Sequence, residues 1–156
     1  MKLVAQFKNI EAEQKQAYFA AAYHQLGIVA QELREYTQAQ EYYQQALNIC
    51  IEYGDRYNQA LTLHQLGRVA QELREYNQAQ KYYQQALNIK IEYGDRFSQA
   101  STLHNLGAVA QELREYTQAQ EYYQQALDIY IECGDLYEQA DTLHQLGIVA
   151  QELREY

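Results

Sequence analysis

The sequence repeats itself with a period of 40 residues, and this repetition limits the possible folds more than any other feature. The segment His24–Tyr53 recurs at His64–Tyr93 with only four substitutions, and a related copy starts at His104. A fourth copy starts at His144 and ends with the chain at Tyr156. The pattern predicts a stack of equivalent units, because a short repeat buries its apolar face only against its neighbours.

Each repeat predicts two helices, and the second repeat illustrates the first of them. Gly54 can adopt the left-handed conformation that ends a helix, and Asp55 can cap the N-terminus of the next one. The first helix is therefore expected over residues 56–73. Its predicted buried stripe follows helical spacing and consists of Leu63, Leu66, Gly67, Ala70 and Leu73.

The second helix of the pair is expected to follow a turn at residues 74–76 and to run to about Tyr93. Asn77 is the predicted cap, and Thr37…Gln40 and Thr117…Gln120 form capping boxes in the neighbouring repeats. The chain contains no proline, which favours unbroken helices. The buried side of this helix is predicted to hold Ala79, Tyr83, Ala86, Leu87 and the stem of Lys90.

Composition excludes several classes of function. The net charge of −9 and the pI near 4.9 argue against binding to nucleic acid or to an anionic membrane surface, since both need basic residues. Two distant cysteines, Cys50 and Cys133, make no disulfide framework and favour a reducing compartment. With no apolar run of membrane-spanning length and no signal-peptide core, a cytoplasmic protein is expected.

An ordered set of residues spans both expected helices of the first repeat: Tyr23, Leu26, Gly27, Ala30, Ala39, Tyr43 and Ala46. This set resembles the signature of the tetratricopeptide-repeat family. The chain departs from that signature in having Ala at the second aromatic position, Ile51 at the proline position, leucine at the first aromatic position of later repeats, and a period of 40 residues instead of 34. The longer period resembles repeats in spindle-orientation scaffolds and in bacterial signalling proteins.

The resemblance implies an all-α fold, a right-handed α-solenoid of antiparallel helix pairs. On this basis residues 1–16 form an N-terminal extension or cap helix, and residues 17–135 form three helix pairs at about 17–55, 56–95 and 96–135. Residues 136–156 form a lone terminal helix of a truncated fourth repeat.

The resemblance also implies that the first helix of each pair lines a concave groove that binds a protein or peptide. Most groove positions repeat, but those of Leu61 and Arg68 vary between copies, which reflects either tuning to a partner or drift on an unconstrained surface. The positions are Ala21, His24, Ile28, Gln31 and Glu32, then Leu61, His64, Arg68, Gln71 and Glu72, then Ser101, His104, Ala108, Gln111 and Glu112, and finally Asp141, His144, Ile148, Gln151 and Glu152.

The four groove histidines do not predict a metal site, because one histidine per repeat cannot converge on one ion when packed helices lie about 8–10 Å apart. They are expected to be groove-facing hydrogen-bonding groups that become charged near pH 6–6.5. The repeated glutamates favour a basic or polar peptide. Some family members bind a partner's C-terminal carboxylate with a Lys/Arg clamp, for which only Arg68 is a candidate here.

The two ends of the chain leave alternatives open. Leu143, Leu146, Val149 and Leu153 of the expected terminal helix have no following helix to cover them. Either the chain is part of a longer array, or its C-terminal end packs against another copy. At the N-terminus Leu3, Phe7 and Ile10 fit a cap helix, an extension of the first helix, or added sequence.

The sequence therefore predicts a protein-interaction scaffold that binds a peptide or partner helix in its groove, with no cofactor. The alternative is a self-assembling, consensus-like or engineered solenoid whose open ends stack. In that case the chain forms a homo-oligomer through its C-terminal helix. A third hypothesis makes the chain the sensor arm of a larger signalling enzyme. Catalysis is not expected, because no nucleophile–base set, phosphate-binding loop or CxxC motif occurs.

Overall fold

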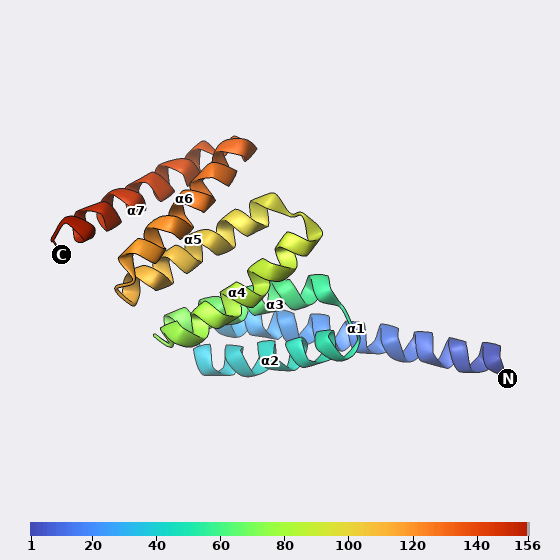
Figure 1. Cartoon of the computed structure of the whole chain (residues 1–156). Helices are drawn as coiled ribbons and strands as arrows, with labels where there is room; N and C mark the ends of the chain where they lie inside the picture. Colours follow the sequence, from blue (N-terminus) through green and yellow to red (C-terminus); the bar gives the residue numbers. More distant parts are fainter. Residues whose placement is uncertain (156) are drawn as a thin grey trace.

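The computed structural model describes residues 1–155, and that part of the chain is helical throughout, apart from short turns (Figure 1). Tyr156, the last residue of the predicted terminal helix, lies outside the described residues. The predicted all-α repeat fold is confirmed: six helices form three antiparallel pairs, and a seventh follows them. The helices are α1 (Lys2–Glu32), α2 (Tyr36–Glu52), α3 (Arg56–Glu72), α4 (Tyr76–Tyr93), α5 (Arg96–Glu112), α6 (Tyr116–Cys133) and α7 (Leu136–Glu155).

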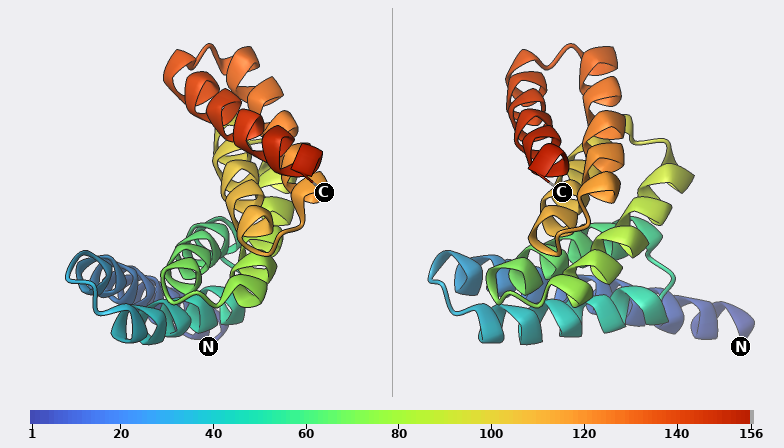
Figure 2. Two further views of the ribbon diagram at one scale, coloured as in Figure 1. Left: turned by 90° about the vertical axis from the view of Figure 1, so that its left-hand side faces the viewer. Right: turned by 60° about the vertical axis from the view of Figure 1, so that its left-hand side comes forward.

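The most extensive packing is between helices that are neighbours along the chain, and the stack is curved (Figure 2). In the left view α3 and α5 lie nearer the inner side of the curve than α2 and α4. The core runs continuously between pairs, because Leu63 and Leu66 of α3 cluster with Tyr43 and Leu47 of the preceding helix and with Ile89 of the following one. The predicted buried stripes of both helix types are therefore confirmed, except that Leu73 is only half-buried at the C-cap of α3.

Each pair is held together where a tyrosine ring lies directly on a glycine. A Cβ added at Gly67 would lie 2.6 Å from Cε1 of Tyr83, and Gly27 and Gly107 face Tyr43 and Tyr123 in the same way. Glycine is therefore required in the middle of these helices by the close approach of the ring, despite its low helix propensity.

The junctions between pairs follow the prediction. Gly54, Gly94 and Gly134 have φ values of 69°, 67° and 72°, in the left-handed region that glycine tolerates. Asp55 then caps α3, because its carboxylate accepts a hydrogen bond from the backbone N–H of Asn58 at 3.2 Å.

The junctions within pairs correct the prediction. The N-cap residues of α2, α4 and α6 lie two positions before the predicted caps Thr37, Asn77 and Thr117, and they make no side-chain cap hydrogen bond; they are Glu35, Glu75 and Glu115. The turn is closed by backbone bonds instead. In the second repeat Arg74 adopts a left-handed φ of 59°, and the N–H of Glu75 donates to the carbonyl of Ala70 at 2.8 Å. This is a Schellman motif with arginine where glycine is usual.

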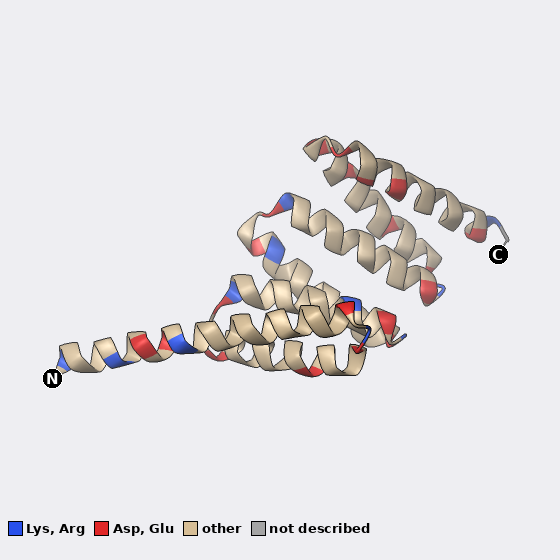
Figure 3. Ribbon diagram, turned by 180° about the vertical axis from the view of Figure 1, so that it is seen from behind, with Lys and Arg blue, Asp and Glu red and all other residues tan. Residues whose placement is uncertain are grey.

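The N-terminal residues continue the first helix. The helix α1 runs for 31 residues, and its first half projects from the stack as a single helix (Figures 1 and 3). Among the readings left open by the sequence, the structure therefore has an extension of the first helix. Leu3, Phe7 and Ile10 are exposed on it.

The last helix is better covered than the sequence suggested. Val149 is fully buried against α6, and Leu146 and Leu153 are half-buried beside the same cluster. Only Leu143 of the four predicted residues remains largely exposed, at 56%. No described helix follows α7, but the preceding helix α6 packs along one side of it and covers three of the four residues in whole or in part.

Candidate functional site

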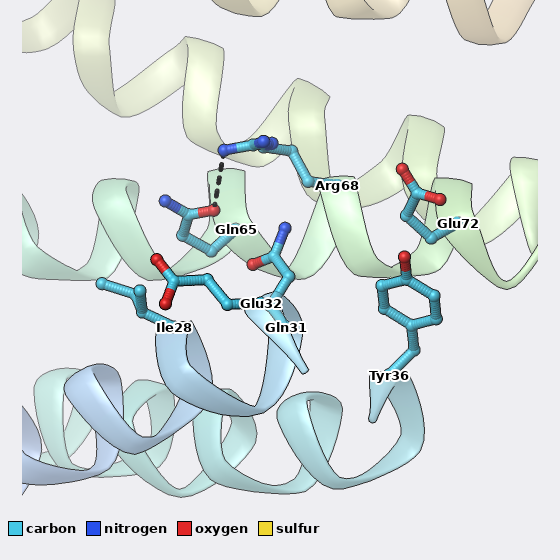
Figure 4. Close-up of a pocket in the computed structure, with 7 residues that line it drawn as sticks. All are labelled: Ile28, Gln31, Glu32, Tyr36, Gln65, Arg68 and Glu72. Atoms are coloured by element: carbon cyan, nitrogen blue, oxygen red, sulfur yellow. Dashed lines mark hydrogen bonds between the residues drawn. The ribbon is translucent and has the colours of Figure 1, made fainter. Parts of the chain in front are cut away.

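A pocket of about 340 Å³ opens between the first helices of the first two pairs (Figure 4). We call it the α1–α3 pocket. It brings together five of the predicted groove residues with two residues that the sequence analysis missed, Tyr36 and Gln65. Its lining is Ile28, Gln31, Glu32, Tyr36, Gln65, Arg68 and Glu72.

One of the two glutamines of this pocket, Gln31, is held by a buried tyrosine. The hydroxyl of Tyr43 donates to Oε1 of Gln31 at 2.9 Å, so the amide nitrogen points away from the ring, toward the space below Arg68 (Figure 4). The same bond joins Tyr83 to Gln71 at 3.0 Å.

The third pair repeats the arrangement, with Tyr123 donating to Gln111 at 3.1 Å. No described residue accepts a hydrogen bond from the three amide nitrogens. Consecutive first helices therefore present a row of N–H donors of fixed orientation, while the amide oxygens are occupied. The constant spacing of twelve residues between Gln and Tyr in every repeat is the sequence signal that could have revealed this row.

One cation and two carboxylates border the pocket. Arg68 makes only a long contact, 3.5 Å from its Nη1 to Oε1 of Gln65, and lies in no ion pair among the described residues. Glu32 and Glu72 flank it (Figure 4). Burial raises the pKa of Tyr43 to about 12, with Arg68 opposing and Glu32 adding to the shift, so the tyrosine remains a donor at neutral pH.

The charges of the chain gather at the helix ends and along the projecting part of α1 (Figure 3). The α1–α3 pocket lies close to one such group, where the first two pairs turn. The carboxylates of Glu32 and Glu72 and the amides of Gln31 and Gln71 thus all lie in the last turn of the first helices.

Three of the four predicted groove histidines contact the neighbouring repeat. Nδ1 of His24, His64 and His104 lies 3.1–3.2 Å from the threonine hydroxyl of the next repeat, and each ring meets the edge or face of a tyrosine. Burial lowers the pKa of all three, and for His64 burial together with the nearby Lys90 lowers it to about 3. The expected titration near pH 6–6.5 is therefore wrong for these histidines, which link one repeat to the next.

A second pocket, of about 300 Å³, lies toward the N-terminal end of α3 and contains three more of the predicted residues, Ala21, His24 and Leu61. Cys50 lines it with a short side chain. At the equivalent position Lys90 reaches across and donates to Oγ1 of Thr102 at 2.7 Å, and Tyr130 fills the third interface. The short side chains of Cys50 and Ala17 thus leave space at the first interface, where the later repeats have Lys90 and Tyr130, and Tyr57 and Phe97.

The remaining predicted groove residues lie on the later first helices. Ser101, Ala108 and Gln111 are half-buried, as is Gln71, whereas Glu112 and His144 are exposed. Within the described residues no cluster of three or more His, Cys, Asp or Glu side chains is arranged to hold a metal ion. None of the described helices is both long and apolar enough to cross a membrane.

A family model described as tetratricopeptide repeat matches residues 18–92 and 98–156, which is most of the chain. The chain belongs to the tetratricopeptide-repeat family. Repeats of this family generally mediate protein–protein interactions. A search of curated proteins finds no match.

Two solved structures show the same tetratricopeptide-like fold. The crystal structure of the apo form of RapI superposes with a TM-score of 0.82 at 21% identity, covering 89% of this chain and 51% of RapI. BtubC (BKLC) from P. vanneervenii superposes with a TM-score of 0.69 at 19% identity, covering 90% of this chain and 66% of BtubC. The chain thus spans about half of RapI and slightly less than two thirds of BtubC.

Proposed function

We propose that this tetratricopeptide-repeat chain is a protein-interaction module that binds an extended peptide along the inner face of its first helices. The observation that carries the proposal is the row of glutamine amides, Gln31, Gln71 and Gln111, whose N–H groups have no described acceptor. An extended peptide offers main-chain carbonyl groups at regular intervals, and these are the acceptors that such a row can bind.

The tyrosines prepare this row before the ligand arrives. Each glutamine is half-buried and its amide orientation is set by a buried tyrosine, so little side-chain entropy is lost when a peptide binds. Amide donors that contact the main chain tolerate many peptide sequences. Selectivity then depends on the residues that vary between repeats, such as Ile28, Arg68 and Ala108.

Charge in the α1–α3 pocket favours a basic or polar peptide. Glu32 and Glu72 outnumber Arg68, and the whole chain carries a net charge of −9. A lysine or arginine of the peptide would be attracted to the two carboxylates, with a strength that falls as salt concentration rises.

The test is selection from a random peptide library displayed on phage, followed by titration of a selected peptide. The double variant Glu32→Gln/Glu72→Gln should bind a basic peptide about tenfold more weakly than the unmodified chain, and the difference should shrink at high salt. The matched control is Glu41→Gln/Glu121→Gln on the second helices, where both residues are exposed. Equal affinity of a selected basic peptide for both double variants would contradict the proposed site.

A further inference from the structure

The pocket that Cys50 lines lies at one of several equivalent interfaces between consecutive helix pairs. Its volume is about 300 Å³, and its wall on α1 consists largely of alanines, among them Ala17 and Ala21. The equivalent site at the next interface is lined by Tyr57 and Lys90 and has a volume of only about 10 Å³. The same place in the fold is therefore open in one copy and filled in the next. We call the open copy the Ala17 pocket.

The open and the filled copy are built from the same elements of their repeats. The lining of the filled copy comes from α3, α4 and residues 95 and 98 at the start of α5, and none of it comes from the preceding pair, α1 and α2. The Ala17 pocket is formed in the same way by α1, α2 and the start of α3. A pair stacked on the other side of α1 would therefore not fill it. The pocket is open because of its own side chains, with alanine and cysteine in place of Tyr57 and Lys90.

Aromatic rings are common to the filled copies of this site. Tyr57 packs edge-on against Tyr93, with ring centroids 5.9 Å apart. At the third interface Phe97 packs against Tyr130 in the same way, also at 5.9 Å, and Tyr130 is 2% exposed. Each filled copy thus has an aromatic side chain from its first helix at the position of Ala17, and the first interface lacks that ring.

The lysine of the second copy is a poorer guide to what the open copy binds. The ammonium group of Lys90 donates to Thr102 at 2.7 Å, but burial lowers the pKa of Lys90 to about 8. The site therefore holds a cation at a cost in free energy. Lys90 is held there by the chain, whereas a separate cation would lose affinity through this cost. A neutral aromatic side chain avoids it and gains from the burial of its ring.

One polar atom of the Ala17 pocket matches a tyrosine hydroxyl. Asn58 lines the pocket, and its amide nitrogen donates to Oδ2 of Asp55 at 2.7 Å. Its amide oxygen accepts no hydrogen bond from any described residue. At the third interface the residue in this position is Glu138, whose side chain forms a hydrogen bond with Tyr130. A tyrosine in the Ala17 pocket therefore finds an acceptor at the equivalent place.

We propose that the Ala17 pocket binds a tyrosine side chain of a partner protein, with the ring between the alanines of α1 and Leu61 and the hydroxyl donating to Oδ1 of Asn58. Ala17, Ala21 and Leu61 are exposed, so a ring can enter without opening a helix pair. A volume of about 300 Å³ is at the lower limit of ligand sites and suits one side chain better than a large cofactor. The site does not depend on the row of glutamine amides, since none of them lines it.

The test is a titration of the full ¹⁵N-labelled chain with the blocked tripeptide N-acetyl-Ala-Tyr-Ala-amide, followed by NMR chemical shifts. Saturable binding with a Kd of about 1–10 mM is expected for one buried ring. The matching tripeptides with leucine or lysine in place of tyrosine should bind at least about tenfold more weakly. Equal or tighter binding of the leucine or the lysine tripeptide, or absence of binding by the tyrosine tripeptide, would overturn the proposal.

Chain variants locate the bound tyrosine. Ala17→Tyr/Cys50→Lys gives the pocket the side chains that fill the next interface, so tripeptide binding should be lost while circular dichroism shows a retained fold. Ala17→Tyr alone, at an exposed residue, should weaken binding at least about fivefold and keeps the test decisive if the double variant unfolds. Ala22→Tyr, at an exposed residue of α1 outside the pocket lining, is the matched control and should bind normally. Undiminished binding to Ala17→Tyr would overturn the proposal.

Two further arms separate the source of the ring and the two pockets. p-Cresol has the same ring without a main chain and should bind more weakly than the tyrosine tripeptide. Tighter binding of p-cresol would overturn the assignment to a protein partner in favour of a free phenol. Glu32→Gln/Glu72→Gln, which alters the α1–α3 pocket, should bind the tyrosine tripeptide as the unmodified chain does. Loss of binding in that variant would place the tyrosine in the α1–α3 pocket and overturn the proposal.

Discussion

Gly67 and Gly147 occupy the same position in their repeats, but their surroundings differ. A Cβ at Gly67 would lie 2.6 Å from the ring of Tyr83, whereas a Cβ at Gly147 would meet nothing within 4 Å. The ring cannot move without opening the pair, since Tyr83 is fully buried. The same residue is thus required by packing at one site and is free of that constraint at the other.

Substituting each glycine by alanine should therefore have opposite effects on stability. Gly67→Ala should lower the free energy of unfolding by about 1–3 kcal/mol through overpacking. Gly147→Ala is the matched control and should leave it unchanged or raise it by up to ~1 kcal/mol, because alanine favours helix. Urea denaturation of both variants measures the difference, and equal losses of stability would contradict this account of the pair.

Lys90 is 6% exposed, and its ammonium group contacts Thr102 and His64 in the interface between two repeats. Burial lowers its pKa from 10.5 to about 8, although Asp95 opposes the shift. Between pH 8 and 10.5 the unfolded chain binds more protons than the folded one at this residue, so its contribution makes stability rise with pH over that window.

Replacing Lys90→Met should stabilise the chain at pH 7 by roughly 2 kcal/mol, since the cost of burying the charge disappears. The advantage of the variant should shrink as pH rises from about 8 toward 10.5, because the native lysine loses its proton there. Urea denaturation of both proteins at pH 7 and pH 10 compares them. A constant difference between the two proteins would show that Lys90 titrates normally.

At the scale of the helix, two kinds of junction alternate along the chain. Junctions between pairs place glycine in the left-handed conformation, but junctions within pairs place Arg34, Arg74 and Arg114 there, each with φ of 59°. A side chain with a Cβ pays a cost in this region that glycine avoids. The arginine is therefore a position of local strain in an otherwise regular helix pair.

Arg74→Gly should relieve this strain and raise the free energy of unfolding by about 1 kcal/mol. The reverse change, Gly94→Ala, should lower it by about 1–2 kcal/mol, because Gly94 has φ of 67°. Thermal denaturation of the two variants is the measurement. Destabilisation by Arg74→Gly would mean that the arginine side chain contributes more than its backbone costs.

Helix positions were predictable because three levels of signal agreed: apolar spacing, glycine–aspartate junctions and a 40-residue period. The starts of the second helices were mispredicted because threonine and asparagine, the residues at positions 37, 77 and 117, are types preferred at N-caps. The backbone bonds of the preceding turn close that junction without them. A Schellman turn is normally recognised in a sequence by its glycine, so the turn cannot be recognised where arginine takes that position.

At the scale of the whole molecule, repetition made the fold predictable and the site difficult to predict. Every repeat carries the same histidine and glutamine, so spacing alone could not tell which face the neighbouring repeat covers. The structure shows His64 bonded to Thr102 of the next repeat, whereas Gln71 keeps its amide nitrogen free of described acceptors. Contacts between repeats decide this difference, and a pattern within one repeat does not contain them.

The central claim is that three glutamine amides on the first helices bind a peptide main chain. Gln→Glu at residues 31, 71 and 111 keeps an oxygen to accept from each tyrosine but removes the N–H donors. The control, Gln→Glu at the exposed residues 45, 85 and 125 of the second helices, adds the same three charges.

The deciding measurement is the affinity of a library-selected peptide for these two triple variants by isothermal titration calorimetry. The account predicts that the first variant binds at least about tenfold more weakly than the unmodified chain and that the control binds equally well. Equal affinity for both variants would contradict the claim that the first helices bind the peptide through these amides.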